Sequence, residues 1–351
     1  MSIALSAVAL ALVVAFVTTR FLCRFNGGWQ ILDQPNERSL HNVPTPRTGG
    51  LGIWLGLVFG MMIVVTHSGI HDKIMWIGTS ALAVGIVSVI DDRFDLSAGV
   101  RLAVHIIAVV LLIQGGLGLD TIRLPGLQLE VAPEAALVLT VLFGVWMTNL
   151  YNFMDGMDGF SGGMAVLGFG TLGTLGYLAG DSYFASMNWV IAAAAGGFLI
   201  LNFPPARIFM GDTGSSTLGL LAATMGLWAD RQGVFPLWIT ALVFSPFIVD
   251  ASVTLGRRLV KRERVWQAHR RHYYQRLVQA GWSHRRAVLW EYALMIVCGF
   301  TAIVAVNAPA AVQWLILGGV VVVYIAAIAG VHRVEACFPP SGRYSRKAPG
   351  G

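Results

Sequence analysis

The chain alternates between long apolar segments and short polar connections. Eleven apolar segments approach the roughly 20 residues that a helix needs to cross a hydrocarbon core of about 30 Å. This repeated pattern predicts an all-α, polytopic membrane protein with about 11 transmembrane helices. We expect the spans at residues 3–20, 50–66, 74–90, 101–117, 135–150, 160–179, 186–201, 215–229, 235–252, 287–306 and 310–330.

Composition supports a membrane protein. Hydrophobic residues make up 56% of the sequence and charged residues 12%. Soluble globular proteins carry about 25% charged residues, so lipid is the expected solvent. No polar stretch has the length of a soluble domain, and we expect 1–351 to form a single membrane domain with a flexible tail at 331–351. The three cysteines, Cys23, Cys298 and Cys337, form no CxxC pair, so neither a zinc site nor a disulfide framework is indicated.

The basic residues are distributed unevenly along the chain. If the N-terminus lies outside, all 24 Lys and Arg residues except Lys73, Arg123 and Arg231 fall in cytoplasmic connections or the C-terminal tail. Cytoplasmic loops collect Lys and Arg, so we predict a periplasmic N-terminus and a cytoplasmic C-terminus. The first apolar segment has no positive charge before Arg20, unlike a cleavable signal peptide, and we expect it to be retained. The charges flank apolar segments, which argues against nucleic-acid binding.

Carboxylates and amides gather where apolar segments reach the predicted cytoplasmic side. Asp91 and Asp92 end one segment, where carboxylates are costly unless they are paired or bind a metal; an ion pair with Arg93 or Arg101 is the alternative. In NLYNFMDGMDG (149–159), oxygen-bearing side chains recur every three residues and so share one face of a helix end. Because Mg²⁺ takes hard oxygen ligands, this spacing favours a metal site over a simple polar cap.

A third motif, NFPPARIFMGDTGSSTLG, spans residues 202–219. Pro204 and Pro205 end the preceding helix, and a glycine-rich turn around Asp212 begins the next one. Such a turn offers backbone N–H groups to anions, while Asp212 adds a charged oxygen for a metal. The GxxxxGK[ST] pattern of a P-loop is absent. The alternative is that Asp212 or Thr213 only caps the next helix.

Histidines and arginines gather in AHRRHYYQRL (268–277). His269 and His272 share a helical face, and Arg271 lies between them. Such side chains can bind a diphosphate or a sugar. A basic helix beside the membrane also contacts anionic lipid headgroups, and spacing alone favours that interpretation.

Two further polar features have both a structural and a functional interpretation. The segment LDQPNERSLHNVPTPRTGG (32–50), which contains Arg47, is either a connector or a lid over the site. Asp250 ends an apolar segment and precedes Arg257 and Arg258 on the same helix side. There, an ion pair that stabilises the helix end competes with a direct role.

Together, the acidic clusters and the His/Arg cluster on one membrane face have the composition of a phosphoryl-transfer site, where Mg²⁺ and cationic groups neutralise phosphate charge. The DD pair, NxxNxxDGxDG and FMGDTGS, in this order, resemble the polyprenyl-phosphate N-acetylhexosamine-1-phosphate transferases of glycosyltransferase family 4. The resemblance runs from about Asp33 to Leu277. The loop DQPNERSLHNVPTPRTGG resembles the branch that initiates O-antigen and other surface polysaccharides.

The resemblance implies roles for individual residues. It assigns Mg²⁺, with Mn²⁺ as an alternative, to Asn152 and Asp212. It assigns the catalytic cluster to Asp91, Asp92, Asp155, His269 and His272. It assigns substrate binding to Arg101 at the diphosphate, Phe209 stacked on uracil, Asp158 at the uracil edge, and to Asn202 and Arg271. One departure is visible, because Arg271 stands where some relatives carry a histidine.

The implied reaction transfers HexNAc-1-phosphate from UDP-HexNAc to undecaprenyl phosphate and releases UMP, at the cytoplasmic face of a bacterial inner membrane. Direct attack of the lipid phosphate on the β-phosphorus is favoured over a covalent aspartyl intermediate. A homodimer is compatible with the resemblance. The competing interpretations are a phospho-MurNAc-pentapeptide translocase, a non-catalytic scaffold, and a secondary transporter, whose carboxylates would lie near the membrane midplane.

Overall fold

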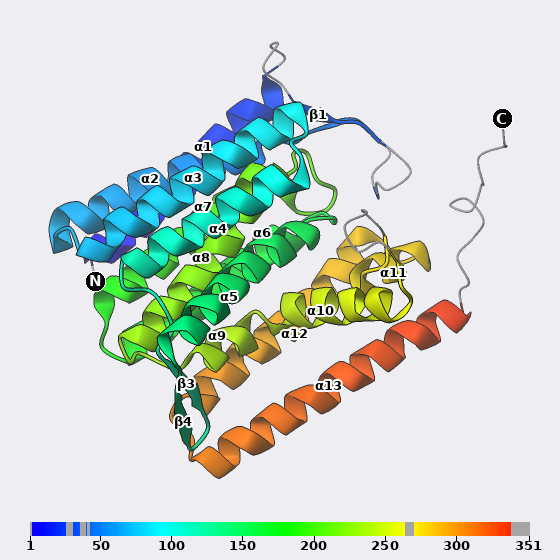
Figure 1. Cartoon of the computed structure of the whole chain (residues 1–351). Helices are drawn as coiled ribbons and strands as arrows, with labels where there is room; N and C mark the ends of the chain where they lie inside the picture. The colour runs from blue at the N-terminus through cyan, green and yellow to red at the C-terminus, as the bar shows by residue number, and fades with distance from the viewer. Residues whose placement is uncertain (1, 26–30, 36–39, 41–42, 264–269, 338–351) are drawn as a thin grey trace.

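A computed structural model describes the chain except for residues 1, 26–30, 36–39, 41–42, 264–269 and 338–351. The described part is a bundle of helices with two short hairpins (Figure 1). The helices are α1 (Ser2–Arg24), α2 (Gly49–Ser68), α3 (Asp72–Phe94), α4 (Ala98–Gln114), α5 (Pro133–Phe153), α6 (Phe160–Leu178), α7 (Ser182–Asn202), α8 (Gly211–Arg231), α9 (Leu237–Val243), α10 (Ser245–Val260), α11 (Tyr273–Gln279), α12 (His284–Ala305) and α13 (Ala310–Cys337).

The hairpins lie toward opposite ends of the bundle (Figure 1). β1 (Leu32–Asp33) pairs antiparallel with β2 (Thr45–Pro46), close to the start of α2. β3 (Thr121–Leu124) pairs antiparallel with β4 (Leu127–Glu130) in the connection between α4 and α5. The chain is therefore all-α in its architecture, as the hydropathy pattern predicts, with strands only in connections among the residues described.

Seven described helices are long and apolar enough to cross a membrane, namely α1, α2, α3, α5, α7, α12 and α13. The ninth predicted segment, 235–252, departs from the sequence expectation. It is not one straight helix, because α9 and α10 meet at a bend of 82°. If this bent pair is one span, the structure holds up to eight such spans in the described residues. The other predicted segments each overlap one helix.

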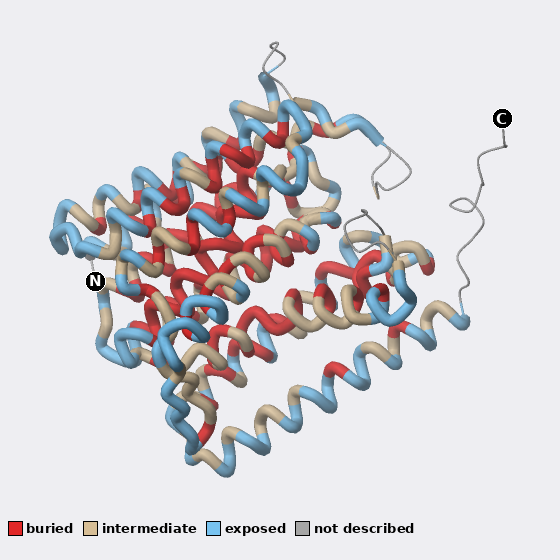
Figure 2. Tube along the Cα trace, in the orientation of Figure 1, coloured by how far each residue is buried: buried red, intermediate tan, exposed pale blue. Residues whose placement is uncertain are grey.

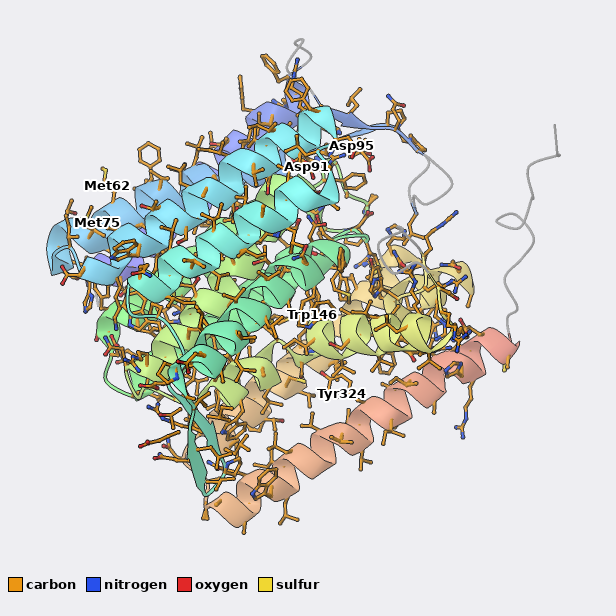
Figure 3. All side chains as sticks on the ribbon, viewed as in Figure 1. Met62, Met75, Asp91, Asp95, Trp146 and Tyr324 are labelled. Carbon is orange, nitrogen blue, oxygen red and sulfur yellow. The ribbon has the colours of Figure 1, made fainter. Side chains whose placement is uncertain are left out.

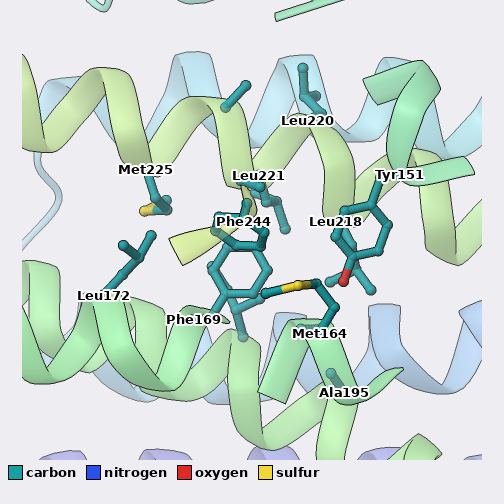
Figure 4. Close-up of a cluster of buried hydrophobic side chains, with 14 of the residues drawn as sticks. Tyr151, Met164, Phe169, Leu172, Ala195, Leu218, Leu220, Leu221, Met225 and Phe244 are labelled. Atoms are coloured by element: carbon teal, nitrogen blue, oxygen red, sulfur yellow. The ribbon is translucent and has the colours of Figure 1, made fainter. Parts of the chain in front are cut away.

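Helix α8 lies at the centre of the bundle, packed against α3 and α5. Every residue from Thr213 to Asp230 is buried, as expected for a helix that other helices surround. Buried residues, red in Figure 2, concentrate around this helix. Figure 4 shows part of this core, in which Phe169 of α6 packs edge-on against Phe244 at the bend. Met164 of α6 and Leu218 of α8 belong to the same cluster.

Helix α13 lies along the outside of the bundle and is exposed over most of its length (Figure 2). Only Tyr324 and Val331 are buried in it. Its exposed side chains include Leu315, Val322 and Ile325. Large exposed apolar surfaces are unusual on soluble monomers, so this face is suited to lipid.

The two ends of α3 differ in chemistry. Figure 3 shows Asp91 and Asp95 at one end of the helix and Met75 at the other. The acidic end lies beside β1, which places it at the same end of the bundle as the first hairpin (Figure 1). The polar motifs of the sequence meet at this end.

Candidate functional site

A pocket of about 270 Å³ opens at the acidic end of the bundle. Its walls come from the β1–β2 region, the 154–159 turn, the 203–210 segment and the starts of α8 and α12. Six residues predicted from the sequence line it, namely Asn152, Asp155, Asp158, Asn202, Phe209 and Asp212. Segments far apart in the sequence therefore converge on one cavity.

Hydrogen bonds to Asp92 connect the end of α3 to the beginning of α8. Its Oδ1 accepts a hydrogen bond from the Asp212 backbone N at 3.0 Å. Its Oδ2 accepts from the Thr213 backbone N at 3.0 Å and from Thr213 Oγ1 at 2.7 Å. The first N–H groups of a helix have no partner within the helix, so a carboxylate there both satisfies them and suits the helix dipole. Asp92 is thus an N-terminal cap supplied by another helix.

Two arginines hold the carboxylates together. Arg47 donates from Nε to Asp92 Oδ1 at 3.0 Å and lies 3.7 Å from Asp212 Oδ1. Arg101 donates to Asp91 Oδ2 at 2.9 Å and to Asp212 Oδ2 at 3.4 Å. Without these cations, three carboxylates of one sign would repel one another in a poorly solvated site. The pairing of Asp91 with Arg101 matches the ion-pair alternative drawn from the sequence.

The turn from 154 to 159 brings Asp155 into the same pocket. Burial raises the pKa of Asp155 to about 7, and the negative charges of Asp212 and Asp92 act in the same direction, against a lowering by the Ser161 hydroxyl and Arg47. A carboxyl with such a pKa can accept or release a proton near neutral pH. Asp155 is therefore suited to proton transfer at this pocket.

The donor atoms of the pocket fit a magnesium ion. Asn152, Asp155 and Asp212 bring hard oxygen atoms to one cavity, and Asn152 is positioned by donating to Ser216 Oγ at 3.1 Å. Within the described ranges, no group of three or more His, Cys, Asp or Glu side chains could hold a metal alone. That sparse set suits Mg²⁺, which commonly takes one or two carboxylates and completes its shell with water and phosphate oxygens.

The other side of the pocket is built around Asp158 and Phe209. Asp158 Oδ2 accepts from the Ala206 backbone N at 3.0 Å, and its Oδ1 lies 3.2 Å from Nδ1 of His284. Phe209 is held through its backbone, because its N donates to the Pro46 carbonyl at 2.7 Å. An aromatic ring and a carboxylate thus share a wall, which is a suitable surface for a planar base with N–H groups.

Asn202 joins two segments of the pocket wall. Its Oδ1 accepts from the Gly159 backbone N at 2.9 Å, and its Nδ2 donates to the Ile208 carbonyl at 2.8 Å. Both polar ends of the side chain are therefore bonded to backbone. The structure gives Asn202 a role in shaping the pocket, and its predicted contact with substrate stays a prediction.

Of the described residues of the His/Arg motif, only Gln275 lines the pocket, and Arg271 and His272 lie beside it. His272 is buried, with Nδ1 3.0 Å from Asp250 Oδ1. Asp250 also accepts from the backbone N atoms of Tyr273 and Tyr274, at 3.1 and 3.2 Å. The ion pair expected between Asp250 and Arg257 or Arg258 is therefore replaced by a bond to His272 and a cap on α11.

The remaining residues of that motif have other surroundings. Arg271 forms an ion pair with Glu263 and lines a second cavity. His269 lies outside the described residues. The catalytic role predicted for His269 and His272 and the substrate contact predicted for Arg271 stay predictions.

Sequence reasoning assigned no site role to several polar residues that line the pocket. His284 lines it next to Asp158, and Gln275 lines it from α11. The available signal for His284 was its position, one residue after the Ser283 cap of α12 on the predicted cytoplasmic side. From the sequence, Arg47 belongs to a segment that is either a connector or a lid. Its contacts with Asp92 and Asp212 show that this segment reaches the site.

Comparison with known proteins shows the family of the chain. The model of glycosyl transferase family 4 matches residues 74–230, which include the DD pair and the two glycine-rich motifs. The chain is 31% identical over 283 residues to a probable undecaprenyl-phosphate N-acetylglucosaminyl 1-phosphate transferase of Bacillus subtilis (strain 168), covering 79% of this chain and 78% of the relative. The chain belongs to glycosyl transferase family 4.

Further relatives carry related names. A decaprenyl-phosphate N-acetylglucosaminephosphotransferase of Mycobacterium leprae (strain TN) is 30% identical over 303 residues, with 76% of this chain and 75% of the relative covered. An undecaprenyl-phosphate alpha-N-acetylglucosaminyl 1-phosphate transferase of Yersinia pestis is 27% identical over 271 residues, with 73% and 72% covered. The family relationship therefore extends over most of the chain.

Proposed function

We propose that this family 4 protein transfers HexNAc-1-phosphate from a UDP-HexNAc to undecaprenyl phosphate, with release of UMP. The observation that carries the proposal is the convergence of Asn152, Asp155 and Asp212 in one pocket beside Arg47. Oxygen ligands and a guanidinium group within one cavity are what the transfer of a charged phosphoryl group requires. The names of the relatives support the choice of polyprenyl phosphate as acceptor and HexNAc-1-phosphate as the transferred group.

The transfer makes one phosphorus–oxygen bond and breaks another. An oxygen of the lipid phosphate attacks the β-phosphorus of the UDP-sugar, and the bond from that phosphorus to the bridging oxygen breaks. UMP leaves with the electron pair. If the acceptor enters as a monoanion, its proton passes to Asp155, whose pKa of about 7 suits that task. We favour this direct attack over a covalent aspartyl intermediate.

Different pocket residues bind different parts of the substrates. Arg47 and Arg101, beside Asp212, neutralise phosphate charge, because guanidinium groups pair well with phosphate oxygens. Phe209 stacks on the uracil ring and Asp158 accepts from its N–H edge. Asp92 holds the start of α8 in place, so that Asp212 keeps its position. Mg²⁺, or Mn²⁺ in its place, held by Asn152 and Asp212 would supply charge stabilisation at the diphosphate.

The proposed setting is the inner membrane of a bacterium, with the N-terminus outside and the pocket open to the cytoplasm. In this arrangement, the chain crosses the membrane eleven times as one domain, with the bent α9–α10 pair counted as one crossing. The distribution of Lys and Arg supports the orientation, since such residues collect on the cytoplasmic side. The product would initiate a surface polysaccharide such as an O-antigen.

The test uses purified full-length protein with a panel of UDP-HexNAc donors. UMP release is measured with undecaprenyl phosphate and Mg²⁺, then without the lipid, and then with EDTA. We expect release with at least one donor only when the lipid and the metal are both present. Full activity in EDTA would show that the reaction needs no metal ion. UMP release without the lipid would show that undecaprenyl phosphate is not the acceptor.

A further inference from the structure

A second cavity, of about 180 Å³, lies at the end of α10. Six cationic side chains line it, namely Arg257, Arg258, Lys261, Arg270, Arg271 and Arg276. The polar side chains of Thr254 and Gln279 complete its lining. None of the described residues that line it is acidic. We call it the basic cavity.

The positive charge around the basic cavity exceeds the negative charge that pairs with it. Glu263 is shared by Arg258 and Arg271, and Glu335 of α13 pairs with Arg276. Arg257 donates to the neutral hydroxyl of Tyr273 at 2.9 Å. Cationic groups gathered around a small volume attract an anion of matching size.

Arg276 is fixed at the wall of the basic cavity. Its Nε donates to Glu335 Oε1 at 2.6 Å and the guanidinium lies over the Tyr273 ring at 4.9 Å. A guanidinium that is already held in place loses little conformational freedom when it pairs with a phosphate.

The basic cavity is separate from the catalytic pocket. The two share no lining residue, and α11 contributes to both, with Gln275 at the pocket and Arg276 at the cavity. A phosphate held by Arg276 and Arg257 is therefore not the phosphate that reacts beside Asp155.

The surroundings of the basic cavity point to a lipid. The two residues before Lys261 are apolar and exposed, Leu259 by 56% and Val260 by 85%. The neighbouring helix α13 exposes apolar side chains along its length. Apolar surface next to clustered cations matches a molecule that has both acyl chains and an anionic headgroup.

We propose that the basic cavity binds the phosphate of an anionic membrane phospholipid, at a site distinct from that of the acceptor lipid. The phosphate pairs with Arg257 and Lys261, beside the guanidinium of Arg276. Its acyl chains lie against Leu259 and Val260. A bound headgroup thus stabilises α11, which also forms part of the wall of the catalytic pocket.

The test compares binding of phosphatidylglycerol and phosphatidylcholine with identical acyl chains to the full chain in neutral detergent, by native mass spectrometry. We expect selective binding of phosphatidylglycerol. The double variant R257Q/K261Q should weaken that binding about tenfold or more, as expected for the loss of a charge-assisted hydrogen bond. The charge-conserving R257K/K261R should retain it. R20Q/R24Q, which removes two charges from the end of α1, serves as the matched control and should bind as the wild type does.

Each other result decides against the proposal. Equal weakening in R20Q/R24Q would mean general attraction to the charged face. Displacement of the lipid by inorganic phosphate would make the ligand a free phosphate, and preference for undecaprenyl phosphate would make the basic cavity an acceptor site. If R257Q/K261Q unfolds, R257K/K261R still decides, since equal binding of both phospholipids to this folded protein would contradict selectivity.

Discussion

Replacement of Asp92 by asparagine separates stability from chemistry at this site. The carboxylate accepts from two backbone N–H groups and one hydroxyl on the first turn of α8 and pairs with Arg47. Asparagine keeps a single acceptor oxygen. Its amide group would face an N–H donor at Thr213 or Asp212 and leave that donor unsatisfied. The Thr213 hydroxyl can reverse its role and accept, so this contact survives.

The magnitude follows from the contacts that are lost. A buried N–H left without a charged acceptor costs about 1.5–3 kcal/mol. The side chain of Arg47 is 29% exposed, so water screens the lost ion pair and adds at most about 1 kcal/mol. We therefore expect Asp92→Asn to lower the free energy of unfolding by about 1.5–4 kcal/mol.

The assay is unfolding in mixed detergent micelles, with UMP release measured on the same samples. Asp155→Asn is the matched control, because Asp155 lines the pocket but does not cap α8. We expect the control to stay folded and to lose activity, whereas Asp92→Asn loses stability as well. Equal stability of Asp92→Asn and wild type would refute the capping role.

Three further predictions concern the pocket. Phe209→Ala should raise the KM for the UDP-sugar about 5- to 150-fold, since base stacking contributes about 1–3 kcal/mol; an unchanged KM would remove Phe209 from the site. Gly211→Ala should destabilise the protein more than Gly233→Ala. Both glycines have a φ near 70°, a conformation that costs a residue with a Cβ about 1–2 kcal/mol. A Cβ at Gly211 would also lie 2.5 Å from the Arg47 carbonyl and 2.8 Å from Asp92 Oδ2, whereas a Cβ at Gly233 would have no neighbour within 4 Å. Finally, Asp155 holds a proton in the folded state up to a pH of about 7, while an ordinary aspartate side chain loses it near 3.8. Unfolding free energy in the absence of Mg²⁺ should therefore fall as pH rises through this window, and Asp155→Asn should flatten the slope; an unchanged slope would contradict the raised pKa.

Hydropathy predicted where helices lie and much less of where they end. The segment 235–252 is mostly apolar, yet a new helix begins in its middle at Ser245, with Pro246 in its first turn. Proline is favoured in the first turn of a helix, so Pro246 marks a helix start within the apolar segment. Helix α13 continues to Cys337, past the predicted span end at 330. The last turns of the helix contain polar residues such as Glu335. Hydropathy detects only the apolar part of a helix, so it did not predict these turns.

The residue types along the sequence predicted which side chains gather at the site. They did not predict which of these side chains bind one another. Asp92 was recognised as unusual from its position, but its cap on α8 joins residues about 120 positions apart. The same holds for Asp250, whose bond to His272 replaces an expected pairing on its own helix. Spacing identifies residues that share a face of one helix, whereas contacts between helices depend on how the bundle packs.

The central claim is that the pocket carboxylates carry the transfer of a sugar phosphate to a lipid phosphate. The most direct measurement is a single-turnover assay of UMP release with Mg²⁺, undecaprenyl phosphate and the preferred UDP-HexNAc, run in parallel on wild type and Asp212→Asn, each shown to be folded. The proposal predicts one UMP per lipid-linked sugar in the wild type and a loss of about 100-fold or more in the variant, in line with the removal of a group that supports transition-state charge. Equal turnover of the two proteins, or UMP without a lipid product, would contradict it.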